Sequence, residues 1–150
     1  MHMRLAVEAD LPAILGLLSA DPISASRAGQ TAEVSERVRQ AFSALQVTDD
    51  HALWVAEANG EVVGTYQLSM LPGLARDGMW RALVESVHVR ADQRGMGVGE
   101  RMMRHAIEQA RARGCGLLQL TSDKRRTDAH RFYQRLGFVA SHEGMKLALE

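Results

Sequence analysis

The feature that most constrains this chain is a glycine-rich turn near its middle, Gln93-Arg94-Gly95-Met96-Gly97-Val98-Gly99. The turn follows an apolar strand pattern over residues 82–89 and runs directly into an amphipathic helix pattern. Because glycine lacks Cβ, such a turn can be tight and can approach a ligand, and the unpaired N–H groups at a helix start attract negative oxygens. The segment therefore predicts a phosphate-binding turn between a strand and a helix.

The spacing of the glycines and of the residues after them distinguishes three kinds of glycine-rich turn. A P-loop requires Lys-Ser/Thr after its last glycine, and here Glu100-Arg101 follows Gly99. The dinucleotide fingerprint requires a third glycine where Glu100 stands, and an acidic residue near position 119 that this chain does not have. The remaining pattern is Arg94-x-x-Gly97-x-Gly99.

This pattern resembles the pyrophosphate loop of the GNAT superfamily of acyl-CoA-dependent N-acyltransferases. A second segment, from Asp128 to Phe138, resembles the later signature of the same family, because it contains Ala129-x-x-Phe132-Tyr133 and ends at Gly137-Phe138. Two signatures in the right order, about 35 residues apart, are far more specific than either alone. The resemblance covers residues 62–149. One departure is Arg126, which stands where many relatives have an Asn that contacts pantetheine.

The resemblance implies one GNAT-like α/β domain over residues 1–150, with a mixed, mostly antiparallel sheet of six to seven strands and about four flanking helices. It also implies that acetyl-CoA is the cosubstrate and that the acceptor is a primary amine of a small molecule, which attacks directly in a ternary complex. Three alternatives stay open at this point. They are a catalytically silent acyl-CoA-binding or sensor domain, the acetylation of a protein or peptide amine, and an unrelated nucleotide-binding domain that the glycine spacing disfavours.

The resemblance also implies which backbone groups bind the cosubstrate. The N–H of Val87 would face the thioester oxygen, and Val89 would pair with the pantetheine like an added strand. The glycine-rich turn would hold the diphosphate through main-chain amides and the Arg94 guanidinium. The residues expected there are Arg94, Gly95, Met96, Gly97, Val98 and Gly99.

Tyr133 and Glu85 are the two candidate catalytic side chains. A phenol with a reference pKa of about 10 stays protonated at neutral pH and can donate a proton to a departing thiolate. An alkyl ammonium must lose a proton before it attacks, and Glu85 lies on the strand ahead of the turn, where some relatives place the base. Two structural alternatives remain: Tyr133 could simply pack its helix, and Glu85 could be an ordinary exposed residue. His88 is a weaker candidate base.

Composition limits the other possibilities. With 150 residues, 46% hydrophobic and three prolines, one globular domain is expected, and no apolar run is long enough to span a membrane. The absence of a signal-peptide pattern and the single cysteine, Cys115, indicate a cytoplasmic protein without disulfides, and no cluster of residues predicts a metal site. The resemblance also allows a homodimer.

Charge is distributed unevenly along the chain. The formal net charge is zero, which argues against nucleic-acid binding through a broad basic surface. Residues 90–135 nevertheless hold eleven Lys/Arg and five Asp/Glu. This positive segment coincides with both signatures and suits a polyanion such as CoA, whereas the acidic remainder suits a cationic amine.

Periodicity predicts the elements. Asn59-Gly60 favours a tight hairpin turn, Asp128 is an expected N-cap, and Gly137 suits a left-handed helix exit. Loops are expected over residues 21–30 and 71–79, the second as a substrate cover or a plain surface connection. Helices are expected over residues 9–18, 34–45, 97–113 and 128–135. Strands are expected over residues 3–7, 52–58, 62–70, 82–89, 117–121, 138–141 and 145–149, with 117–121 buried and the last two as an antiparallel pair.

Overall fold

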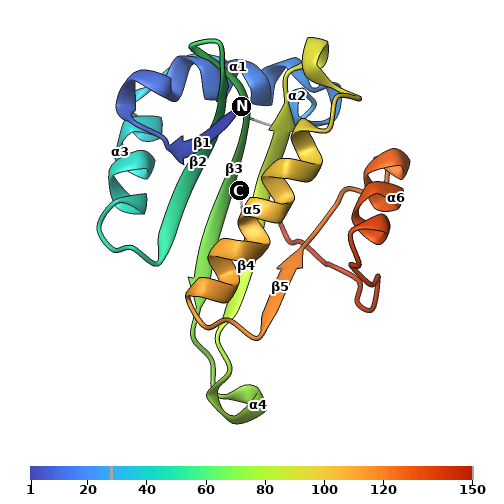
Figure 1. Ribbon diagram of the computed structural model, residues 1–150. Coiled ribbons are helices and arrows are strands. Elements are labelled where there is room, and N and C mark those ends of the chain that lie inside the picture. Colours follow the sequence, from blue (N-terminus) through green and yellow to red (C-terminus); the bar gives the residue numbers. More distant parts are fainter. Residues whose placement is uncertain (28, 150) are drawn as a thin grey trace. The chain divides into compact units, whose positions relative to one another are not determined.

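The computed structural model describes residues 1–27 and 29–149, and the chain divides into two compact units, Met1–Gln119 and Leu120–Glu150. The prediction of a single domain over residues 1–150 remains a prediction. The elements, shown in Figure 1, are β1 (His2–Leu5), η1 (Glu8–Asp10), α1 (Leu11–Ala20), α2 (Pro22–Ala25), α3 (Glu36–Leu45), β2 (His51–Ala58), β3 (Glu61–Leu71), α4 (Ala75–Gly78), β4 (Arg81–Val89), η2 (Ala91–Gln93), α5 (Val98–Ala112), β5 (Leu117–Leu120) and α6 (Thr127–Arg135).

The sheet has the order β1-β2-β3-β4-β5, and the first three pairings are antiparallel. In Figure 1, β5 points in the same direction as β4, so the sheet is mixed. The hairpin between β2 and β3 turns at Asn59 and Gly60, whose φ angles of 52° and 78° are both positive. The predicted hairpin is therefore confirmed, because Asn and Gly tolerate the left-handed region that such a turn requires.

The alternation of β3 separates two layers of helices. Thr65 and Gln67 face a cavity that residues of α1 and α3 also line. Gly64 faces the other side, since an added Cβ there would meet the side chain of Met102 on α5. Because successive residues of a strand point to opposite faces, α5 covers one face and α1 and α3 cover the other.

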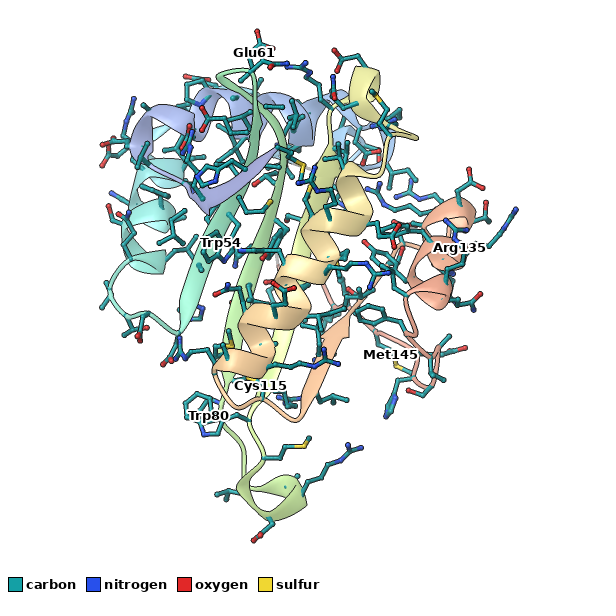
Figure 2. All side chains as sticks on the ribbon, viewed as in Figure 1. Trp54, Glu61, Trp80, Cys115, Arg135 and Met145 are labelled. Atoms are coloured by element: carbon teal, nitrogen blue, oxygen red, sulfur yellow. The ribbon has the colours of Figure 1, made fainter. Side chains whose placement is uncertain are left out.

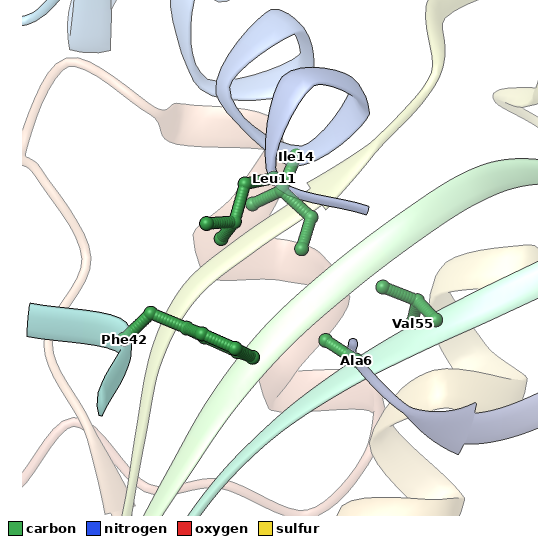
Figure 3. Close-up of a cluster of buried hydrophobic side chains, with 5 residues drawn as sticks. All are labelled: Ala6, Leu11, Ile14, Phe42 and Val55. Atoms are coloured by element: carbon green, nitrogen blue, oxygen red, sulfur yellow. The ribbon is translucent and has the colours of Figure 1, made fainter. Parts of the chain in front are cut away.

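The core under α1 contains a compact cluster from four segments of the chain (Figure 3). Apolar residues at helical spacing on α1 and α3 meet side chains from the β1–η1 connection and from β2. Burying a side chain such as Phe42 contributes roughly 1.5–3 kcal/mol, which fixes these helices on the sheet. The cluster consists of Ala6, Leu11, Ile14, Phe42 and Val55.

Five strands and six α-helices lie within residues 1–27 and 29–149, so the prediction of six to seven strands and about four helices is wrong in number. The two additional helices, α2 and α4, are single turns in segments expected to be loops. Ala28, which belongs to the first of these expected loops, lies outside the described residues. The missing strands are those expected over residues 138–141 and 145–149.

Those two segments lack the partner that a strand requires. Their apolar residues Val139, Met145 and Leu147 are each more than 80% exposed. The backbone hydrogen bonds of described residues 138–149 that lie outside regular elements join Ser141 N to Val139 O and Phe138 N to Tyr133 O of α6, and neither joins two strands. Alternating apolar residues predict a strand only if a neighbouring strand accepts and donates hydrogen bonds, and the described part of this segment has no such neighbour.

Two smaller expectations also need correction. Asp128 is not the N-cap of α6, because the helix begins one residue earlier and Arg126 takes that position. Asp128 instead lies in the first turn, where a negative charge is still favourable beside the helix dipole. The strand β5 is not buried, since Leu117 is exposed and the other three residues are half-buried. Gly137 has a φ of 101° and ends α6 as expected.

None of the helices in residues 1–27 and 29–149 has the length and apolar character needed to cross a bilayer.

Candidate active site

The glycine-rich turn adopts the conformation that its sequence predicts. After β4 the chain forms η2, extends at Arg94, and then turns through Gly95 and Gly97, whose φ angles are 76° and 82°. Gly97 is the N-cap of α5 and has no side chain to bond the first amides of the helix. Non-glycine residues avoid this left-handed region, so these two glycines determine how the helix begins.

The amides of this turn point away from internal acceptors. Gly95, Met96, Gly97 and Val98 donate no backbone hydrogen bond of ordinary geometry among the described residues, and Met96 is 69% exposed. The first N–H groups of a helix have no intrahelical partner, and together with the helix dipole they form an anion-binding site. This arrangement fits a diphosphate.

The space outside the turn is open. Apart from the adjacent residues in the chain, no heavy atom of residues 1–27 and 29–149 lies within 4 Å of the position that a Cβ would occupy at Gly95 or Gly97. The Arg94 side chain folds back toward β4, and its Nε donates to the carbonyl oxygen of Val89 at 3.3 Å. The turn can therefore admit a ligand close to its backbone, with a guanidinium beside it.

A β-bulge interrupts β4 just before the turn. Gln67 of β3 pairs with Glu85 and Thr65 pairs with His88, so Tyr66 alone lies opposite two residues, Ser86 and Val87. Ser86 has a φ of 53°, a left-handed conformation that a non-glycine residue adopts at an energetic cost. Such bulges redirect the strand locally and often occur beside active sites.

The last part of β4 has an uncovered edge. β5 has four residues against nine in β4, and Gly116 N donates to Trp80 O at 3.0 Å, so β5 begins beside the start of β4. Figure 2 labels Trp80 and Cys115 at this end. At about 3.3 Å per residue, β5 ends before it reaches Val87 and Val89. In the part of the chain that the structure describes, no strand pairs with this edge at Val87 and Val89, although the Val89 carbonyl accepts a hydrogen bond from Arg94 Nε. The expected role of the two residues stays a prediction.

Glu85 is exposed and lies beside two residues that line the cavity. The Nε2 of Gln67 donates to its Oε2 at 3.4 Å, and Ser86 is its neighbour in the chain. The rival base His88 is only 8% exposed and lies opposite Thr65. Solvent access and the adjacent cavity favour Glu85 over His88 as a base, and its role stays a prediction.

The cavity lies between the sheet and the helices α1 and α3 and has a volume of about 210 Å³. Its walls are apolar, and polar side chains occur only on the β3 and β4 side. The lining residues are Leu11, Ile14, Leu15, Leu18, Val38, Ala41, Phe42, Leu45, Leu53, Thr65, Gln67 and Ser86.

Tyr133 lies in α6, within the second unit. Its ring packs edge-on against Phe132 and Phe138, with centroids 5.1 Å and 5.7 Å away. Burial raises the pKa of the phenol above its ordinary value, and the nearby positive charge of Arg126 only partly opposes this. The phenol is therefore protonated at neutral pH, which is what a proton donor needs.

Several other side chains that could be reactive contact neighbouring side chains within the fold. Cys115 has its Sγ 3.5 Å from the Met70 sulfur, and burial raises the pKa of its thiol, which disfavours a thiolate nucleophile. The Tyr66 hydroxyl lies 2.7 Å from Nδ1 of His105, whose ring packs edge-on against Trp54. Within residues 1–27 and 29–149, no three His, Cys, Asp or Glu side chains converge as metal ligands.

The sequence did not indicate the cavity, the bulge or the involvement of Ser86. A serine within an apolar strand pattern has no special periodicity, and the cavity walls come from five separate elements. Aligning β3 with β4 in a regular antiparallel register could have indicated the Gln67–Glu85 contact. The bulge shifts the register by one residue, so a regular alignment does not place all of these pairs correctly.

Comparison with known proteins supports the same conclusion. Residues 16–138 match the model of the Acetyltransferase (GNAT) family. The chain is 35% identical to an aminoalkylphosphonate N-acetyltransferase of Salmonella typhimurium over 69% of this chain and 67% of that protein. It is 30% identical to an L-methionine sulfoximine/L-methionine sulfone acetyltransferase of Pseudomonas paraeruginosa over 89% of this chain and 77% of that protein.

A solved structure from Bacillus halodurans C-125, described as a transcriptional regulator, superposes with a TM-score of 0.94. It is 38% identical and covers 99% of both chains. The matched segment of the family model includes the glycine-rich turn, the bulged strand and the Phe132-Tyr133 signature. The chain belongs to the GNAT family of acetyltransferases.

Proposed function

We propose that this protein transfers the acetyl group of acetyl-CoA to the primary amine of a small molecule, by direct attack in a ternary complex. The observation that carries the proposal is the combination of open amides at residues 95–98 with the uncovered edge of β4 next to them. One site binds a diphosphate and the other pairs with an extended amide chain, which together match the two parts of CoA.

The residues of this chain would divide the chemistry as follows. The Val87 N–H polarises the thioester carbonyl, and Glu85 accepts a proton from the ammonium directly or through a water. The neutral nitrogen then forms the new C–N bond, the C–S bond breaks, and Tyr133 donates its proton to the departing thiolate. The named acetyltransferases among the relatives support an amine on a small molecule as the acceptor.

A direct assay tests the proposal. The purified chain is incubated with acetyl-CoA and a panel of primary amines, and both free thiol and the acetylated amine are measured. Amine-dependent thiol release with a matching amide product is the expected result. Thiol release that does not depend on any amine would indicate hydrolysis and would contradict the proposal.

A catalytically silent acyl-CoA sensor is the second candidate. It is favoured by the likeness to the Bacillus halodurans protein that is described as a transcriptional regulator. The same assay separates the two functions when CoA binding is measured by calorimetry in parallel. A sensor would bind acetyl-CoA and release no thiol with any amine.

A further inference from the structure

The chemistry of the cavity between the sheet and α1/α3 bears on the acceptor. Nine of its twelve lining residues are apolar, and none is Lys, Arg, His, Asp or Glu. A charged group placed among such walls would lose its hydration without gaining a partner. Among the described lining residues, therefore, nothing compensates an anionic or cationic group inside the cavity.

The polar end of the cavity lies beside the candidate base. Gln67 and Ser86 line the cavity, and both adjoin Glu85, one through a 3.4 Å side-chain contact and the other through the chain. Thr65 is also at this end, but its hydroxyl already donates to the Trp54 carbonyl at 2.9 Å. A molecule in the cavity would thus have one end near a carboxylate and its other end among leucines of α1 and α3.

The volume sets the size of the occupant. Apolar cavities of about 150 Å³ take up a molecule as large as benzene. The cavity here, at about 210 Å³, can hold an aromatic ring or a branched aliphatic chain. Its half-exposed and exposed rim residues, Leu18, Ala41 and Leu45, give the occupant a route of entry.

We propose that the acceptor is a primary amine with an uncharged apolar arm, which fills this cavity while the ammonium lies near Glu85. This inference rests on the proposed acetyl transfer and narrows its substrate class. It separates the chain from its relative named for aminoalkylphosphonates, because a phosphonate in this cavity would find no cationic partner. Specificity would come from the apolar residues of α1 and α3.

The test compares amines that differ in the arm. Values of kcat/KM are measured with acetyl-CoA for 3-methylbutylamine and 2-phenylethylamine, against 2-aminoethylphosphonate and ethanolamine. A single methylene bound in an apolar pocket changes kcat/KM by about 10-fold or more. We therefore expect kcat/KM to be about 10-fold or more higher for the two apolar amines.

Two variants locate the effect. Ala41→Trp fills the cavity from its exposed rim and should lower kcat/KM for the apolar amines by about 10-fold or more, with little change for ethanolamine. Ala13→Trp is the matched control, because Ala13 is exposed on α1 and does not line the cavity. Circular dichroism and thermal unfolding show whether both variants fold.

A binding measurement that does not require turnover tests the cavity separately from the proposed acetyl transfer. Methyl NMR follows the lining leucines as 3-methylbutylamine is added to the protein with CoA. Shifts in Leu11, Leu15 or Leu18 without acetylation of any amine would support the cavity and refute the transferase. Acetylation of 2-aminoethylphosphonate in preference to both apolar amines, or equal losses in the two tryptophan variants, would overturn the cavity inference alone.

Discussion

At the scale of single residues, Tyr133 has the properties of a proton donor without being in a strained position. Its ring is held between Phe132 and Phe138, so the orientation of the phenol is fixed by packing. Because the buried environment raises its pKa, the proton stays on the oxygen across the physiological range. A thiolate, whose conjugate thiol has a pKa of about 8.5, is a weaker base than the phenolate, so the phenol helps by donating to the negative charge that develops on sulfur as the C–S bond breaks.

Replacing Tyr133 by Phe removes the proton and keeps the ring. We expect kcat to fall by about 10²-fold while the affinity for CoA changes little, because only the proton donor is lost. Steady-state kinetics and calorimetry measure the two effects. In the unmodified protein, protonated Tyr133 is the active form, so activity is lost as pH rises through its pKa, which lies above the ordinary ~10. Unchanged turnover in Tyr133→Phe would remove Tyr133 from the mechanism, and a fall in kcat between pH 7 and 9 would belong to another group.

At the scale of elements, the start of α5 is the part most directly tied to function. A helix usually begins with a side-chain cap, but here the N-cap is a left-handed glycine that leaves the first amides without an internal partner. Those unpaired groups cost stability in the free protein and become bonded when an anion binds. The other end of α5, near Gly114, also turns through positive φ, but there the Gly114 N–H donates to the Arg111 carbonyl at 3.0 Å.

A matched pair of substitutions separates strain from ligand binding. Gly97→Leu and Gly114→Leu both force a side chain into the left-handed region, with φ of 82° and 78° and no neighbouring atom within 4 Å in either case. Each should lose roughly 1–2 kcal/mol in the free energy of unfolding. We expect Gly97→Leu alone to weaken CoA binding, by about 10-fold or more, because its side chain occupies space beside the amides. Calorimetry and denaturant unfolding provide both numbers, and tight CoA binding by a folded Gly97→Leu variant would refute the amide site.

The sequence predicts elements whose backbone conformation depends on a few adjacent residues. It does not predict features that depend on contacts between segments far apart in the chain. Asn59-Gly60 and the glycines of the turn determine their own backbone, so the hairpin and the start of α5 follow from a few residues. Strands over residues 138–149 were wrongly predicted because alternation gives no information about whether a partner strand is present. The cavity was missed for the same reason, since its walls are brought together by the packing of α1, α3 and three strands.

At the scale of the whole molecule, membership of the GNAT family and the distribution of charge both favour CoA as the ligand. The chain has no net formal charge, but its positive segment, residues 90–135, contains the turn and the helix that would bind a polyanion. A ligand that binds only the folded state stabilises it in proportion to the logarithm of its concentration. The response of thermal stability to different nucleotide cofactors therefore reports which one this fold recognises.

We expect CoA and acetyl-CoA to raise the Tm, and ATP and NAD to leave it unchanged. At a concentration 100 times the Kd, binding adds about 2.7 kcal/mol, which for a chain of this size corresponds to roughly 5–10 °C. Differential scanning fluorimetry at equal ligand concentrations is sufficient. Stabilisation by NAD that equals the effect of CoA would contradict the acyl-CoA assignment and favour a dinucleotide site.

Because of the bulge in β4, Ser86 is an extra residue that has no partner of its own on β3. Glu85 and His88 have their own partners on β3, and Ser86 and Val87 stand together opposite Tyr66. A chain that lacked Ser86 could therefore keep the pairings of Glu85 and His88 and place Val87 alone opposite Tyr66. Loss of a residue of β4 outside the bulge would instead shift the register on one side of the loss and turn the side chains there to the wrong face. The pairing of β3 with β4 thus has one extra residue, immediately beside the cavity, where the strand could change length and keep its register.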